Sequence, residues 1–150
     1  MRTFHFEIAT PERVVYKDEV EGVTLPTFDG EITILASHVP LVTIVRPGEL
    51  VIRKGNEVRP YAIGGGFLEM DGTKLVVLAD TTEHVAEIDE QRAEEARQRA
   101  EELKKTKAIS DVEFTKMSAK LERDLNRLRV VRKYRHRGHV GIMQEGIRKE

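Results

Sequence analysis

Residues 74–103 read KLVVLADTTEHVAEIDEQRAEEARQRAEEL, and the chain changes character within this stretch. It begins with a short apolar run that is typical of a buried strand. From residue 89 onward, apolar side chains recur at the spacing of one helix face: Ala93, Ala96, Ala100 and Leu103. Residues 73–137 contain neither Pro nor Gly, so long helices can form there. We therefore predict one domain of residues 1–86 and a second of residues 87–137, followed by a tail, residues 138–150, of unknown role.

The first domain is expected to consist of many short strands. Phe4, Phe6 and Ile8 alternate with polar residues, which is the period of a half-buried strand. Further strand-like runs follow at 13–16, 20–25, 31–35, 42–45, 49–54, 57–63, 67–70 and 74–79. Turn dipeptides separate several of them: Asp29-Gly30, Pro47-Gly48, Gly55-Asn56 and Asp71-Gly72. This spacing indicates a β-sandwich or a barrel, of which we predict the sandwich.

The second domain is expected to be two antiparallel helices. Asp89 is suited to cap the first helix, and Ser110 with Glu113 matches a capping box at the start of the second. The second helix carries its own apolar stripe: Phe114, Met117, Leu121, Leu125, Leu128 and Val131. A seam lined by alanine buries little area, so the hairpin should be stable by only a few kcal/mol and able to open. The predicted fold class is α+β, an N-terminal antiparallel β-sandwich followed by a C-terminal antiparallel two-helix hairpin. Roughly residues 104–109 are expected to connect the two helices.

The composition argues against several kinds of active site. The chain has no Cys, which excludes disulfides, thiolate metal sites and Cys nucleophiles. The one close histidine pair, His136 and His139, lies among arginines that would repel a metal cation. The run Gly64–Gly66 precedes a strand-like FLEM rather than a helix, so it indicates a turn with close backbone packing and not a phosphate loop. We expect no catalytic residues and no metal site, and hence no enzyme.

The strongest charge signal lies near the C-terminus. The net charge of the whole chain is −1, yet residues 104–150 hold 14 Lys and Arg against 6 acidic residues. Such a basic segment favours an anionic partner: nucleic acid, an acidic protein surface or nucleotide phosphates. An uncommitted, solvated helix end is the simpler alternative. Within residues 123–137, Tyr134 is the one Phe, Tyr or Trp available for base stacking, and the first half of the chain is acidic, so nucleic acid is disfavoured.

A second charged feature lies at the start of the first predicted helix. Arg92 follows Asp89 by one turn, and an arginine at a helix N-terminus opposes the helix dipole. Arg92 therefore needs a partner, which could be Asp89, Glu83 or an anionic ligand. On spacing alone, a local pair of Asp89 and Arg92 is the simpler interpretation.

Four pieces of the sequence together resemble one family. These are GEITIL (30–35), SHVPLV (37–42), GGFLE (65–69) and the helix start Arg92-Ala93. Over residues 1–133 the chain resembles the epsilon subunit of bacterial F-type ATP synthase. The resemblance implies a ten-stranded sandwich that binds the gamma subunit and the c-ring. It also implies a hairpin that either folds on the sandwich or extends into the alpha/beta catalytic hexamer, where it blocks ATP hydrolysis.

The resemblance implies two sets of partner-binding residues. On the sandwich these are His38, Pro40 and Leu41, and on the second helix they are Arg129, Arg132, Lys133 and Arg135, which would meet an acidic segment of a beta subunit. The implied location is peripheral, on the cytoplasmic face of the bacterial plasma membrane, with membrane contact only through the complex and no nucleic-acid partner.

ATP is implied as a regulatory ligand of the folded hairpin, with no catalytic cofactor. The implied ATP-binding residues are Glu83, Ile88, Asp89, Arg92, Ala93, Arg99, Arg123 and Arg127. Asp124, beside Arg123, departs from the family pattern and would weaken phosphate binding. Two other functions stay open from the sequence: an autonomous ATP-sensing module without an inhibitory role, and a nucleic-acid-binding tail.

Overall fold

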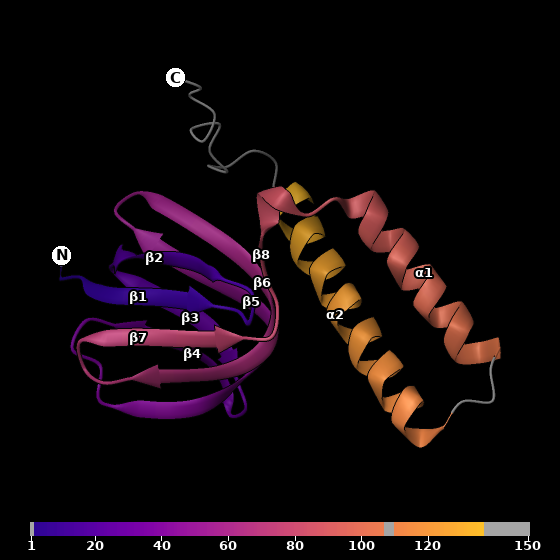
Figure 1. Cartoon of the computed structure of the whole chain (residues 1–150). Coiled ribbons are helices and arrows are strands. Elements are labelled where there is room, and N and C mark those ends of the chain that lie inside the picture. The colour runs from indigo at the N-terminus through magenta and orange to yellow at the C-terminus, as the bar shows by residue number, and fades with distance from the viewer. Residues whose placement is uncertain (1, 107–109, 137–150) are drawn as a thin grey trace.

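The structure is a computed structural model that describes residues 2–106 and 110–136. The predicted tail, residues 138–150, lies outside the described residues, as do His139 and part of the predicted helix connector, residues 107–109. Figure 1 shows a β-sandwich with two helices beside it. The strands are β1 (Phe4–Ala9), β2 (Val14–Val20), β3 (Gly22–Thr27), β4 (Gly30–Leu35), β5 (Leu41–Lys54), β6 (Glu57–Met70), β7 (Lys74–Ala79) and β8 (Thr82–His84). A 3-10 turn, η1 (Val85–Glu87), leads to the helices α1 (Glu90–Thr106) and α2 (Asp111–His136).

The strands follow the order β2-β1-β7-β6-β5-β3-β4, and β8 pairs with β6. Neighbouring strands are antiparallel, as predicted, except that β1 and β7 run parallel. A parallel pair needs a long connection, and the chain between β1 and β7 provides one. The predicted sandwich-plus-hairpin fold is therefore confirmed, with one parallel pair that the short-turn signals did not predict.

The predicted turns at Pro47-Gly48 and at Gly64–Gly66 are wrong. Both stretches lie inside the long strands β5 and β6, where Pro47 pairs with Gly64 and Gly48 with Ile63. The glycine run does serve close backbone packing, because a Cβ on Gly66 would lie 1.9 Å from the carbonyl oxygen of Leu78. Counting each long strand as two segments turns the eight strands into the ten that the resemblance implies.

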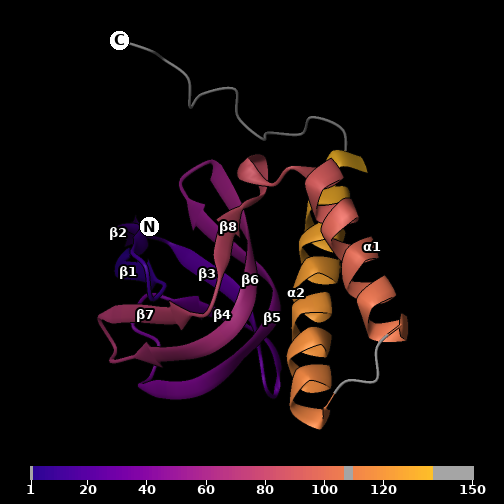
Figure 2. The ribbon, with the colours of Figure 1, turned by 45° about the vertical axis from the view of Figure 1, so that its right-hand side comes forward.

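The hydrophobic core fills the sandwich, and a second, smaller apolar cluster joins it to the helices. The large side chains of the main core include Phe6, Ile8, Leu25, Leu50 and Ile63. The second cluster, which we call the docking cluster, consists of Ala62, Val85, Ile88, Ala93, Leu128 and Val130. Figures 1 and 2 both show α2 lying between the sandwich and α1. The hairpin is therefore attached to the sandwich through α2.

The position of α2 between two partners corrects part of the predicted stripe. Phe114 and Leu125 are exposed, whereas Asp124 and Asn126 are buried. An apolar stripe that assumes contact with one helix cannot predict this pattern, because α2 also buries a second side against β5 and β6.

Both predicted caps are confirmed. Asp89 accepts a hydrogen bond from the backbone N–H of Arg92, and Ser110 and Glu113 exchange two hydrogen bonds. No helix in the described part of the chain is long and apolar enough to span a membrane.

Candidate functional site

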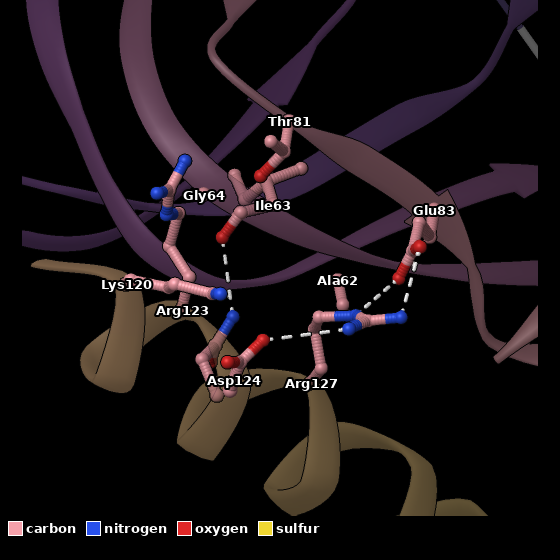
Figure 3. A pocket seen from close by; sticks show the side chains of 10 residues that line it. Ala62, Ile63, Gly64, Thr81, Glu83, Lys120, Arg123, Asp124 and Arg127 are labelled. Carbon is pink, nitrogen blue, oxygen red and sulfur yellow. Dashed lines mark hydrogen bonds and ion pairs between the residues drawn. The ribbon is translucent and has the colours of Figure 1, made fainter. Parts of the chain in front are cut away.

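A polar cavity of about 220 Å³ lies between the sandwich and α2 (Figure 3). Strand β6 and the segment leading into β8 form one wall, and α2 forms the other. The lining residues are Ala62, Ile63, Gly64, Thr81, Glu83, Lys120, Arg123, Asp124, Asn126 and Arg127. Three cations and two carboxylates therefore share a small space. Its volume is below the range of about 300–1,000 Å³ that is usual for small-molecule pockets, so it fits phosphate groups better than a whole nucleotide.

Arg127 is the cation in this cavity that forms ion pairs with both carboxylates, Glu83 and Asp124. Its Nε and Nη2 donate to the two carboxylate oxygens of Glu83 at 2.6 and 3.1 Å, and its Nη1 lies 3.4 Å from Oδ1 of Asp124. This bidentate geometry is the strong form of an arginine–carboxylate pair. Without a ligand, the protein's own carboxylates therefore neutralise Arg127.

Asp124 gives the cavity an unusual feature. The residue is only 6% exposed, and its Oδ2 has no hydrogen-bond partner among the described residues. A buried carboxylate oxygen without a partner is costly. An anion entering the cavity would meet Asp124 as well as the cations, and the weakening of phosphate binding by this residue stays a prediction.

Asn126 fixes the position of α2 on the sandwich. The residue is 5% exposed, and its Nδ2 donates to the carbonyl oxygens of Gly48 and Ile63 at 3.0 and 3.1 Å. Gly48 on β5 pairs with Ile63 on β6, so one side-chain amide donates hydrogen bonds to both strands. The sequence did not single out this role, because an asparagine between arginines on a helix is also typical of a solvated surface.

The predicted ATP-binding residues divide into three groups. Glu83, Arg123 and Arg127 come together in the cavity, while Ile88 and Ala93 are buried in the docking cluster. Asp89, Arg92 and Arg99 do not line the cavity. The Arg92 side chain is 86% exposed, and its Nε lies 3.6 Å from Oδ2 of Asp89, which is the local pair that the spacing favoured. Arg99 is exposed seven residues further along α1, and hence on nearly the same helix face as Arg92.

The predicted basic residues of α2 mostly pair with carboxylates of the same chain. Arg132 pairs with Glu90 and Glu94 at 3.2 and 2.9 Å, and Arg135 also pairs with Glu90. Lys133 pairs with Glu49 on β5. Arg129 is exposed, and no ion pair joins it to another described residue. In the folded chain, three of these four basic side chains therefore already have acidic partners.

The segment that leads into α1 contains a partly buried histidine. Nδ1 of His84 accepts a hydrogen bond from the backbone N–H of Ala86 at 3.1 Å, and this bond caps η1. The ring stands edge-on to Tyr61, with 5.0 Å between the centroids. Burial lowers the pKa of His84 below its ordinary value, and Glu87 opposes that shift. The neutral ring is the form that can accept this hydrogen bond.

The predicted stalk-binding residues lie next to an exposed apolar row. His38 and Pro40 precede β5, and Leu41 begins it. Further along the same sheet, Ile44 pairs with Phe67, and Phe67 pairs with Leu78. All three side chains are exposed, and so is Val42. A contiguous apolar patch of this kind marks an interaction surface. The sequence signal was available: strand positions facing solvent carry apolar residues where alternation calls for polar ones.

Comparison with known proteins identifies two family domains. Residues 3–85 match the beta-sandwich domain of the ATP synthase delta/epsilon chain, and residues 86–132 match the long alpha-helix domain of the same chain. An ATP synthase epsilon chain of Caldicellulosiruptor saccharolyticus is 43% identical over 136 residues, which cover 91% of this chain and 98% of that one. One of Chloroflexus aggregans is 49% identical over 89 residues, 59% of this chain and 64% of its own length.

Solved structures share the fold at lower identity. A chain in the mitochondrial ATP synthase of Euglena gracilis, described as OSCP/F1/c-ring, superposes with a TM-score of 0.68 at 20% identity. The match covers 80% of this chain and 76% of that chain. A chain from the central stalk and c-ring of the Tetrahymena thermophila enzyme gives a TM-score of 0.55 at 15% identity, covering 89% and 96%. With both domains matched in order along the chain, the protein belongs to the family of ATP synthase epsilon chains.

Proposed function

We propose that this epsilon-type chain binds the gamma subunit and the c-ring through its sandwich and inhibits ATP hydrolysis when its hairpin leaves the sandwich. Its role is coupling and regulation, without a catalytic step of its own. The observation that carries the proposal is the way the hairpin is attached. Among the described residues, a docking cluster of six small or medium apolar residues, one buried asparagine and two ion pairs join α2 to the sandwich. An attachment of this size can be exchanged for contacts with a partner.

The ion pairs of the folded state support the same two-state behaviour. Arg132, Lys133 and Arg135 pair with carboxylates of this chain when the hairpin is folded. In the extended state, an acidic segment of a beta subunit would replace those carboxylates. Charge pairs with the partner would compensate for those lost on opening, so the free-energy difference between the two states would be small and open to regulation.

The exposed apolar row is the proposed gamma-binding surface. It runs from Val42 and Ile44 on β5 to Phe67 on β6, so it starts directly after Leu41, the last residue of the segment assigned to stalk contact. The loop with His38 and Pro40 would face the c-ring. We propose a peripheral location for the chain, on the cytoplasmic face of the membrane, with membrane contact only through the complex.

The stalk proposal is tested by co-purification of the chain with gamma and the c-ring. Phe67→Ser removes an exposed aromatic ring from the row and should weaken binding at least about tenfold, since aromatic anchors dominate interface energies. Val58→Ser is the matched control, because Val58 is similarly exposed on β6 but lies at its other end. Equal binding by both variants would overturn the assignment of this surface.

We propose in addition that ATP binds the folded hairpin. The supporting observation is the convergence of Lys120, Arg123 and Arg127 in one cavity. The phosphates would compete with Glu83 and Asp124 for Arg127, and the base would lie toward Ile88. Arg92 and Arg99 would reach the phosphates through a shift of α1. A ligand that binds only the folded hairpin stabilises it by mass action.

Thermal unfolding with and without ATP tests this second proposal. ATP should raise the melting temperature of the wild-type chain, and Arg92→Ala and Arg127→Ala should each remove most of the rise. Glu102→Ala, on the same hairpin but outside the cavity lining, should keep it. No rise at millimolar ATP would reject ATP binding and leave the stalk function standing. A rise in a chain that fails to join the catalytic hexamer would favour the autonomous sensor.

A further inference from the structure

Glu49 makes a compact contact with the last turns of α2. One of its carboxylate oxygens accepts a hydrogen bond from the Tyr134 hydroxyl, and the other lies 2.5 Å from the Lys133 ammonium. The Lys133 ammonium also lies 5.6 Å from the centroid of the Tyr134 ring. We call these three side chains the Glu49 contact. The Glu49 side chain is 17% exposed, so its charge is more shielded from solvent than that of a typical surface carboxylate.

The position of Glu49 makes this contact different from the other ion pairs of the hairpin. Glu49 follows the Asn126-bound Gly48 on β5, so it belongs to the sandwich and does not move with the helices. Glu90 and Glu94, which pair with Arg132, belong to α1. Among the described residues, two ion pairs join α2 to the strands, Glu49 with Lys133 and Glu83 with Arg127. The second lines the cavity assigned to phosphate, and the first does not.

Tyr134 connects the Glu49 contact to the apolar attachment of the hairpin. Its ring packs against the docking cluster, beside Val85 and Ile88 at the entry to α1. Its hydroxyl reaches Glu49. A half-buried tyrosine of this kind keeps its apolar ring packed while its hydroxyl has a hydrogen-bond partner. Losing the carboxylate would therefore weaken an ion pair and a packed aromatic ring together.

We propose that Glu49 holds the hairpin in its folded position by occupying Lys133, the residue that an acidic partner segment would otherwise bind. The inference rests on the proposed two-state function and adds to it a residue of the sandwich that sets the balance between the states. Glu49 acts as an internal substitute for the partner's carboxylate. Removing its charge favours the extended hairpin while leaving the phosphate cavity intact.

The proposal is tested on the isolated, full-length chain by distance measurement between two spin labels. The chain has no Cys, so labels can be placed on cysteines introduced at Lys17 of β2 and Lys116 of α2, both exposed. Glu49→Gln and Lys133→Gln should each raise the ratio of long to short distances about tenfold, as expected for loss of a charged hydrogen bond. Glu57→Gln is the matched control, because it breaks an exposed carboxylate–arginine pair with Arg59, and both residues of that pair belong to β6.

Exchanging the charges of Glu49 and Lys133 distinguishes loss of this specific ion pair from general destabilisation of the sandwich. Glu49→Lys should open the hairpin, and adding Lys133→Glu should close it again. Unchanged distances in Glu49→Gln would overturn the proposal, and so would a Glu49→Lys opening that Lys133→Glu fails to reverse. The measurement needs neither ATP nor another subunit. A failure of Glu49→Gln to open the hairpin is therefore distinguishable from a failure of the proposed inhibition. Inhibition is measured only in the assembled enzyme.

Discussion

Asn126 shows how one side chain can decide where a helix lies. Its side-chain amide donates to carbonyl groups of two neighbouring strands, Gly48 on β5 and Ile63 on β6. The arginines on either side of it, Arg123 and Arg127, then project along the same cavity. The phosphate-binding capacity of α2 thus depends on a residue that need not touch a ligand.

Replacing Asn126 by leucine should weaken the attachment of α2. The change removes the amide donor from the carbonyl oxygens of Gly48 and Ile63, at a cost of about 1–3 kcal/mol in the free energy of docking. Hydrogen exchange should show faster exchange of the α2 amides, with the core strands unaffected. Gln98→Leu serves as control, since it removes an amide from α1 that bonds only to Glu94 in the described structure. Equal protection of α2 in both variants would mean that Asn126 contributes nothing to docking.

Gly66→Ala should destabilise the whole sandwich. Gly66 has a φ of +150°, and an added Cβ would overlap the backbone of Leu78. Backbone strain alone costs about 1–3 kcal/mol, and the clash adds to it. Gly55→Ala, at a φ of +58° with open space around it, should cost only about 1–2 kcal/mol. Denaturant unfolding compares the two, and similar losses would contradict the close approach of β6 and β7.

At the scale of elements, the junction between β8 and α1 is sensitive to protonation. His84 caps η1 as a neutral acceptor, and η1 positions Val85 and Ile88 in the docking cluster. Burial holds the pKa of His84 below that of an exposed histidine. The unfolded chain therefore binds the proton more readily than the folded one. The contribution of His84 to stability is complete above about pH 6.5 and is lost as the pH falls below that value.

This sign gives a testable pH dependence. Between about pH 6.5 and 5, the melting temperature of the wild-type chain should fall more than that of His84→Asn, which can still cap η1 but does not titrate. The carboxylates with lowered pKa values, Asp18, Asp71 and Glu94, lose their contribution only at lower pH and affect both chains alike. Parallel curves for the two chains over this window would show that His84 protonation does not oppose folding.

At the scale of the whole molecule, local patterns predicted the elements better than their mutual contacts. The change from strands to helices, the caps at Asp89 and Ser110 and the hairpin all follow from short-range spacing. The turn chemistry of Pro47-Gly48 gave a wrong break in β5, because pairing with β6 overrides a local turn preference. The pair of Glu49 and Lys133 spans 84 positions and leaves no periodic signal. Glu83 and Arg127 were linked only through the family resemblance, and the structure places them in one ion pair.

We propose that the hairpin is a detachable inhibitor on an independently folded stalk-binding domain. ATP hydrolysis by the enzyme reconstituted with the full chain, and with residues 1–86 alone, tests this proposal. The fragment keeps the main core, so it should fold, join the complex and support ATP synthesis. Hydrolysis should be faster with the fragment than with the full chain. Equal hydrolysis rates, with both chains shown to be incorporated, would contradict it.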